Sequence, residues 1–113
     1  MNQAALSQVG VIGDLQQHVI RLAKLTQQAG LDGVVCSAAE TPELRKELGK
    51  KFCLVTPGIR PESASLDDQK RVATPAAALR MGSSYLVIGR PITQAPDPLA
   101  ALQTIHTECQ SNL

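Results

Sequence analysis

The stretch Phe52-Cys53-Leu54-Val55-Thr56-Pro57-Gly58 decides the fold, because a short apolar run gives way at once to a proline and a glycine. A continuous apolar run of this kind is typical of a strand that is buried on both faces of a parallel sheet. Similar runs occur on either side of it, at residues 33–36 and 84–88. We therefore predict three adjacent parallel strands in sequential order, at residues 33–36, 52–55 and 84–88.

An amphipathic segment before the first of these strands predicts a helix. Between residues 14 and 29, apolar side chains recur at steps of three and four residues, which places them on one helical face. They are Leu15, Val19, Leu22, Leu25 and Ala29. Asp14 is expected as the N-cap and Gly30 as the residue that ends the helix. A shorter helix at residues 3–8 is expected to precede it.

Three further helices are indicated by a capping residue that is followed by proline. The pairs Thr41-Pro42, Thr74-Pro75 and Asp97-Pro98 each combine an N-cap side chain with a proline at the first helical position. The apolar face of the last helix is expected to comprise Leu99, Leu102 and Ile105. Because helices alternate with strands, the connections are crossovers between parallel strands, and the fold class is α/β.

The composition excludes several classes of function. The 113 residues carry 11 Lys and Arg against 10 Asp and Glu, and a net charge of +1 offers little attraction for nucleic acid or an anionic membrane. One Tyr and one Phe provide no stacking platform for single-stranded nucleic acid. Three cysteines without a CxxC pair, and histidines without a ligand at suitable spacing, predict no metal site. With no leader or membrane-spanning run, we expect a soluble, cytoplasmic protein.

The candidate site lies in the loops that follow the second and third predicted strands. Ligands bind in α/β proteins at the carboxyl ends of the strands. Gly89 allows the backbone to approach an anion closely, and Arg90 provides a planar set of donors that suits phosphate oxygens. The alternative is that Gly89 only forms a turn and that Arg90 is only a solvated surface charge. Their position directly after a buried strand, beside a second Pro/Gly/Arg loop, favours a phosphate site.

Residues 57–73 carry prolines, serines and aspartates without a helical or strand period. A stretch of this kind inside a compact domain is usually a functional loop. Within it, Lys70 and Arg71 are expected to belong to the polar surface.

Three segments together resemble orotidine 5′-phosphate decarboxylase of the bacterial type. They are residues 30–37, residues 54–61 with Asp68-Gln69, and residues 87–93. The resemblance is collinear from about residue 11 to about residue 105. It implies that residues 1–113 are one C-terminal part of a (β/α)8 TIM barrel, units six to eight, without a second domain. It also implies decarboxylation of orotidine monophosphate to UMP and CO2 in pyrimidine biosynthesis, by a homodimer without a cofactor.

The resemblance further implies a substrate-binding role for five residues. Arg90, with the backbone of Gly89, would hold the substrate phosphate. Gln69 would lie over the phosphate and the pyrimidine. Arg60 would support the phosphate end, and Pro57 would line the base.

The catalytic residues of the family are not matched in this sequence. The family uses an Asp-x-Lys-x-x-Asp motif on earlier strands of the barrel. The only Asp-x-Lys here is Asp68-Gln69-Lys70, and Ala73 stands where the second Asp should be. We therefore assign no catalytic residue and expect the 113 residues alone to be inactive.

Two alternatives to a decarboxylase remain at this point. One is a related barrel enzyme that acts on another phosphorylated sugar, and the other is a non-catalytic phosphate-binding or scaffold fragment. A barrel of this fold needs roughly 250 residues, so the chain is less than half of one. Because the strands at residues 33–36 and 84–88 would each lack a neighbour, we expect marginal stability and self-association.

Overall fold

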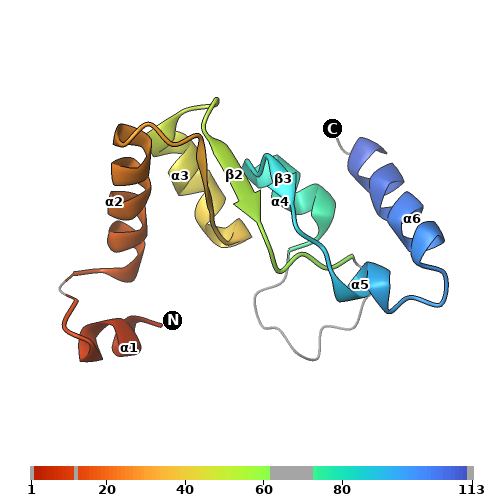
Figure 1. Ribbon diagram of the computed structural model, residues 1–113, viewed down its shortest axis with the longest axis horizontal. Coiled ribbons are helices and arrows are strands. Elements are labelled where there is room, and N and C mark those ends of the chain that lie inside the picture. Colours follow the sequence, from red (N-terminus) through yellow and green to blue (C-terminus); the bar gives the residue numbers. More distant parts are fainter. Residues whose placement is uncertain (1, 12, 62–72, 112–113) are drawn as a thin grey trace.

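The computed structural model describes residues 2–11, 13–61 and 73–111 and consists of a small sheet with a layer of helices (Figure 1). The strands are β1 (Gly33–Val35), β2 (Cys53–Thr56) and β3 (Tyr85–Leu86). The helices are α1 (Gln3–Gln8), α2 (Leu15–Gln28), α3 (Thr41–Leu48), α4 (Pro75–Met81), α5 (Arg90–Thr93) and α6 (Pro98–Ser111), and a 3-10 turn, η1 (Ala38–Glu40), precedes α3.

The sheet has the order β1-β2-β3 and is parallel throughout, as predicted. Gly33 pairs with Cys53, and Val55 pairs with Tyr85. β1 and β3 are shorter than expected, whereas β2 has the expected length but begins and ends one residue later. A further hydrogen bond extends the pairing beyond β3, because the Val87 N–H donates to the Thr56 carbonyl at 2.9 Å.

Gly33 allows β1 and β2 to approach each other closely. A Cβ at this position would lie 2.6 Å from the Cβ of Cys53 and against the carbonyl group of the same residue. Only glycine fits this contact without a shift of one strand.

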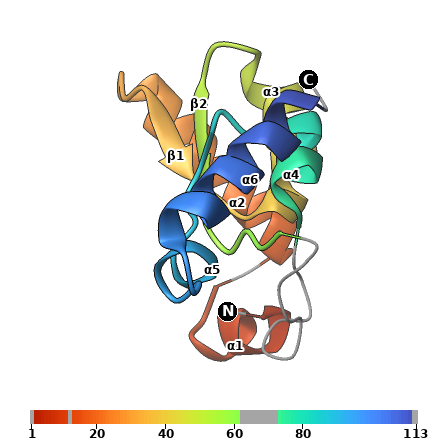
Figure 2. The ribbon, with the colours of Figure 1, turned by 90° about the vertical axis from the view of Figure 1, so that its right-hand side faces the viewer.

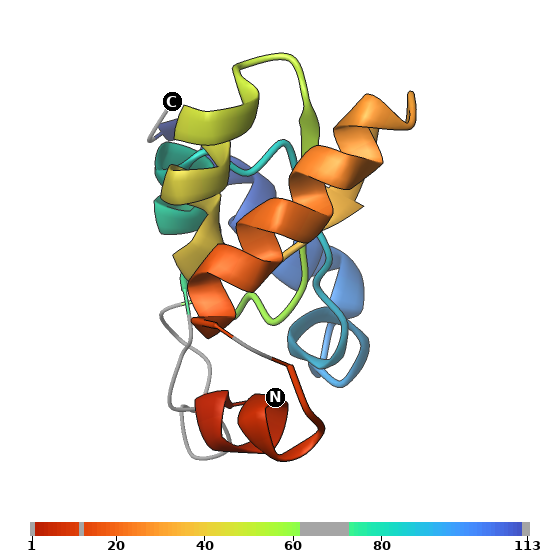
Figure 3. The same ribbon diagram turned by 90° about the vertical axis from the view of Figure 1, so that its left-hand side faces the viewer.

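Helices α2, α3, α4 and α6 form a layer along the strands. In two opposite views, α3 and α4 lie on the same side of β1 and β2 (Figures 2 and 3). Contacts run from α2 to α3, from α3 to α4 and from α4 to α6. This arrangement is that of an arc of βα units.

The other face of the sheet is apolar and open in the described structure. Val35, Val55 and Tyr85 lie in one register row on this face, and the side chains of Val35 and Tyr85 are 71% and 65% exposed. Parallel sheets are normally covered on both faces. The open apolar face is therefore the kind that forms the interior of a closed barrel.

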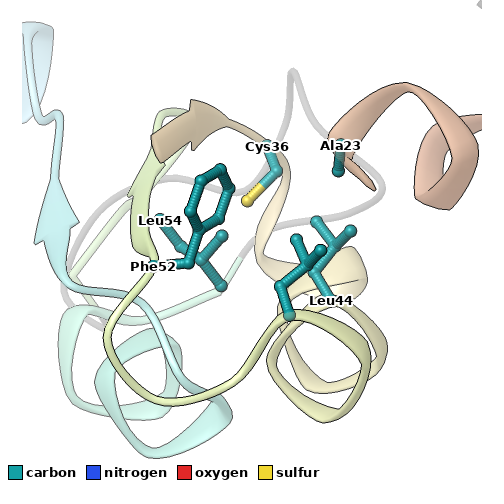
Figure 4. Packing of buried hydrophobic residues seen from close by; sticks show 6 residues of the cluster. Ala23, Cys36, Leu44, Phe52 and Leu54 are labelled. Atoms are coloured by element: carbon teal, nitrogen blue, oxygen red, sulfur yellow. The ribbon is translucent and has the colours of Figure 1, made fainter. Parts of the chain in front are cut away.

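The core lies between α2, α3 and the sheet. Its buried residues are Ala23, Cys36, Leu44, Leu48, Phe52 and Leu54 (Figure 4). Leu54 is fully buried at the centre of β2, so the middle strand contributes the most deeply buried residue of this cluster.

The helix starts confirm three of the four predicted caps. The side chains of Asp14, Thr74 and Asp97 each accept a backbone N–H of the first turn. The prediction for Thr41 is wrong, because it is the first residue of α3 and not its N-cap. Its hydroxyl donates to the Ala38 carbonyl at 2.7 Å, since η1 runs directly into the helix.

The predicted apolar faces of the two long helices are only partly correct. In α2, Val19 packs on the core beside Ala23, but Leu22 and Leu25 are about half exposed. In α6, Ile105 is buried, whereas Leu99 and Leu102 are exposed. In both helices, one edge of the apolar face packs against other described residues, and the other edge is exposed. Within the described ranges, none of the helices combines the length and apolarity that a membrane span requires.

Arg45 links α3 to the two segments that lead into β2 and β3 at the amino end of the sheet. Its guanidinium donates to the carbonyls of Gly82 (2.6 and 3.1 Å), Phe52 (2.5 Å) and Gly49 (2.9 Å) and to the hydroxyl of Ser84 (3.1 Å). These bonds bring the segment before β2 and the segment before β3 to one side chain.

Candidate functional site

The two loops of the candidate site leave the sheet side by side. β2 and β3 are neighbours and run in parallel, so their carboxyl ends meet at the same edge of the sheet. The hydrogen bond from Val87 to Thr56 joins them one step before Pro57 and Ile88. The loop after β2 lies next to α5 (Figures 1 and 2).

The loop after β2 is held by its own backbone. Gly58 has a φ of +72°, a conformation that favours glycine. Ile59 is buried and forms an isolated parallel bridge with Ala73, and the Arg60 N–H donates to the Ala73 carbonyl at 3.1 Å. The described residues on either side of segment 62–72 are therefore paired, and Arg60 lies half-buried at this point.

The loop after β3 becomes the short helix α5, which the sequence did not lead us to expect. Gly89 is its N-cap, and the Gly89 carbonyl accepts the N–H groups of Ile92 (2.9 Å) and Thr93 (3.0 Å). Arg90 is the first helical residue and is exposed. No described residue forms a hydrogen bond or ion pair with the Arg90 guanidinium.

Gly89 lies beside open space. Its φ is −106°, and a Cβ at this position would meet no heavy atom within 4 Å among the described residues. Neither left-handed geometry nor internal packing therefore requires glycine here. The open space leaves the backbone accessible to a ligand atom, which is what a phosphate site needs.

A hollow of about 400 Å³ joins the loop after β2 to α5 and α6. Pro61 and Arg90 both line it, so the structure brings the end of the first loop next to the arginine of the second. Pro57 and Gly89 are exposed at the same edge of the sheet but are not part of this lining.

A larger hollow of about 800 Å³ lies elsewhere, between α1, α2 and η1. Its charged residues are Asp14 and Glu40, so its charge disfavours an anion. We therefore place the candidate anion site at Arg90 and not in the larger hollow. The predicted site residue Gln69 lies outside the described residues, as do Lys70 and Arg71.

Cys36 and Cys109 do not suit nucleophilic catalysis. Burial, and then the charge of Glu40, raise the pKa of the Cys36 thiol, although a hydrogen bond with Thr56 and the charge of Arg45 act in the opposite direction. Burial followed by the charge of Glu108 raises the pKa of Cys109. Both thiols are therefore protonated at neutral pH. In the part of the chain that the structure describes, no three His, Cys, Asp or Glu side chains gather as metal ligands.

Sequence reasoning missed one polar contact beneath the site. The hydroxyls of Thr56 and Ser83 lie 2.6 Å apart and are both buried. The only local signal is a threonine at the end of an apolar strand, and nothing in the sequence indicates that its partner lies 27 residues away.

Comparison with known proteins gives concordant matches. The model of the "Orotidine 5′-phosphate decarboxylase / HUMPS family" matches residues 1–105. "Orotidine 5′-phosphate decarboxylase" of Nitrosococcus oceani is 61% identical over 108 residues, which are 96% of this chain and 47% of that relative. The protein of the same name from Nitrosomonas eutropha is 56% identical over 113 residues, which are 100% of this chain and 49% of the relative.

Solved structures agree with these matches. Orotidine 5′-phosphate decarboxylase from Lactobacillus acidophilus superimposes with a TM-score of 0.81 at 38% identity, over 96% of this chain and 44% of that chain. The enzyme from Pyrococcus horikoshii OT3 has a TM-score of 0.69 at 20% identity, over 85% of this chain and 43% of that chain, which shows the shared fold alone. The chain thus spans about half the length of the curated relatives that it matches.

Proposed function

Because the chain belongs to the orotidine 5′-phosphate decarboxylase / HUMPS family, we propose that it forms the part of an orotidine 5′-phosphate decarboxylase that binds the substrate phosphate. The predicted α/β fold, part of a (β/α)8 barrel, is confirmed by the parallel sheet and by the structural matches. We assign residues 1–113 to units six to eight of that barrel. The complete barrel would convert orotidine monophosphate to UMP and CO2, as the names of relatives at 56–61% identity suggest.

Arg90 is the central residue of this proposal. The observation that carries it is an exposed guanidinium, without a described partner, at the carboxyl end of β3. A guanidinium can donate two parallel hydrogen bonds to phosphate oxygens, and this geometry makes it a strong phosphate ligand. The open backbone at Gly89 would allow the same phosphate to approach the main chain.

Three further residues complete the proposed phosphate half of the site. Arg60 supports the phosphate end from the neighbouring loop, where its backbone is paired with Ala73. Pro57 lines the base, which is supported by its position directly after β2. Gln69 covers the phosphate and the pyrimidine, and this role rests on the sequence resemblance alone.

The chemical step is assigned to the rest of the barrel. The sequence has no Asp-x-Lys-x-x-Asp motif, so a carboxylate that stresses the substrate and a lysine that protonates the product carbon must come from other units. Phosphate lies far from the reacting carbon, but its binding energy orients the substrate and so contributes to turnover. We propose no cofactor for this reaction.

We also propose that the complete enzyme is a cytoplasmic homodimer. The support is the sequence resemblance and the metabolic role of the named relatives. Sedimentation of the complete protein with and without UMP tests the dimer, because a monomer under both conditions would contradict it.

The direct test joins this chain to the part of the Nitrosococcus oceani relative that the chain does not cover. We expect the hybrid to consume orotidine monophosphate and release UMP, and the 113-residue chain alone to show no turnover. A folded hybrid that leaves orotidine monophosphate intact but acts on another phosphorylated sugar would favour the related barrel enzyme. A hybrid that binds phosphate without any turnover would favour a non-catalytic fragment.

A further inference from the structure

A buried pair of hydroxyl groups lies beneath the two loops of the proposed phosphate site. The side chain of Thr56, the last residue of β2, is fully buried, and Ser83, which precedes β3, is 7% exposed. Their hydroxyl oxygens are 2.6 Å apart, and either can donate. An unpaired hydroxyl in such surroundings would be unfavourable, so both hydroxyls favour this contact, and the Thr56 hydroxyl also forms a hydrogen bond with the Cys36 thiol.

Thr56 also holds the other end of the β3 segment. Its carbonyl accepts the N–H of Val87 at 2.9 Å, two residues before Gly89. The side chain of Thr56 therefore contacts the residues that lead into β3, while its main chain contacts the residues that lead out of it. Thr56 is followed directly by Pro57, so it lies where the loop after β2 begins and also contacts the residues that lead into the loop after β3.

The short length of β3 makes these contacts important. β3 has only two residues, and its pairing with β2 is extended by one hydrogen bond at each end, from the Ser84 N–H to the Leu54 carbonyl (2.8 Å) and from the Val87 N–H to the Thr56 carbonyl (2.9 Å). A strand that slips by one residue turns its side chains to the opposite face and moves by about 3.3 Å along its own axis. Such a slip would move Arg90 relative to Arg60 by more than the length of a hydrogen bond, so the two side chains could no longer reach the same phosphate.

We propose that Thr56 is a positioning residue, whose buried hydroxyl, paired with Ser83, fixes the register of β3 on β2 and thereby the spacing between the Pro57–Arg60 loop and Arg90. This inference rests on the proposed phosphate site. It goes further because it assigns the geometry of that site to two residues that do not touch the ligand.

The test uses the 113-residue chain, with inorganic phosphate as the probe and NMR as the readout. Thr56→Val removes the hydroxyl at nearly constant volume, and Thr56→Ser retains it. Thr107→Val is the matched control, since the Thr107 hydroxyl bonds only within α6, to the Gln103 carbonyl. Hydrogen exchange of the Val87 amide reports on the register, and urea unfolding reports on global stability.

We expect Thr56→Val to raise the Kd for phosphate at least fivefold and to speed exchange at Val87 more than at core amides. Thr56→Ser should restore the Kd to within about twofold, and Thr107→Val should leave it unchanged. A purely structural role would lower the stability of Thr56→Val but leave the phosphate Kd of the folded chain unaltered, and that result would overturn the inference.

Two further variants keep the outcomes distinct. Ser83→Ala removes the same hydrogen bond from the other side, so if Thr56→Val does not fold, wild-type phosphate affinity in Ser83→Ala overturns the inference. Arg90→Ala tests the proposed function separately. If Arg90→Ala weakens binding but both hydroxyl variants do not, the phosphate site stands and the positioning role is wrong. If the unsubstituted chain does not bind phosphate, or Arg90→Ala binds it equally well, the proposed site itself fails.

Discussion

Replacement of Arg45 by alanine should destabilise the chain strongly for a change to a half-buried charge. Its guanidinium makes five hydrogen bonds, which connect α3 to the segments before β2 and β3. Lys46, the next residue of α3, is exposed and provides a matched control. Arg45→Lys retains the charge but cannot reach all of the acceptors at once.

The expected magnitude follows from the burial of these bonds. The bonds to Gly49 and Ser84 are exposed, so water can replace them at little net cost. The other three are partly buried and end on two carbonyls, those of Phe52 and Gly82. Leaving each of these carbonyls without its partner costs about 1–1.5 kcal/mol. Arg45→Ala should therefore lower the free energy of unfolding by about 2–3 kcal/mol.

Urea unfolding, followed by circular dichroism, measures this difference. With an m-value of about 1.5 kcal/mol/M, the midpoint should fall by about 1.3–2 M. Lys46→Ala should change the free energy of unfolding by less than about 0.5 kcal/mol, and Arg45→Lys should lie between the two. An Arg45→Ala midpoint that coincides with that of Lys46→Ala would refute the reasoning.

Three more predictions concern the sheet. Gly33→Ala should lower the free energy of unfolding by about 1–3 kcal/mol in the same urea titration, because its Cβ would collide with Cys53, and an unchanged midpoint would contradict this. The pKa of the Cys36 thiol is raised in the folded chain above its ordinary value of 9.0, so the folded state keeps this proton to a higher pH than the unfolded state does. The free energy of unfolding should therefore fall as the pH rises above about 9. A Cys36→Ala chain with the same alkaline decline would contradict this. Val35→Lys places a charge on the open apolar face and should reduce self-association in size-exclusion chromatography, and an unchanged elution profile would argue against that face as the contact.

The sequence predicted those parts of the fold that have local causes. Strand positions followed from short apolar runs, and the starts of α2, α4 and α6 followed from Asp14, Thr74 and Asp97, because a cap acts within one helical turn. The cap predicted at Thr41 was wrong because η1 precedes α3, and a 3-10 turn has no clear pattern of its own.

Contacts between distant residues could not be predicted in this way. The bonds of Arg45 to Gly82 and of Thr56 to Ser83 join residues that are 37 and 27 positions apart. The half-exposed Leu22 of α2 shows the same limit, since periodicity identifies an apolar stripe but not which edge of it packs on the described core. For the candidate site, the sequence places Arg90 directly after a strand, as the structure does, but its role in binding phosphate stays a prediction and the helix α5 was not foreseen.

The steady-state kinetics of Arg90→Ala, in the hybrid of this chain with the remaining part of the Nitrosococcus oceani relative, test the central claim most directly. Loss of a bidentate charged contact should cost about 2–3 kcal/mol, which corresponds to a fall in kcat/KM for orotidine monophosphate of about 30- to 150-fold. Arg21→Ala, which removes an exposed arginine of α2, should leave kcat/KM within about twofold. An Arg90→Ala hybrid with the unchanged kcat/KM of its parent would contradict the assignment of this chain as the phosphate-binding part of the enzyme.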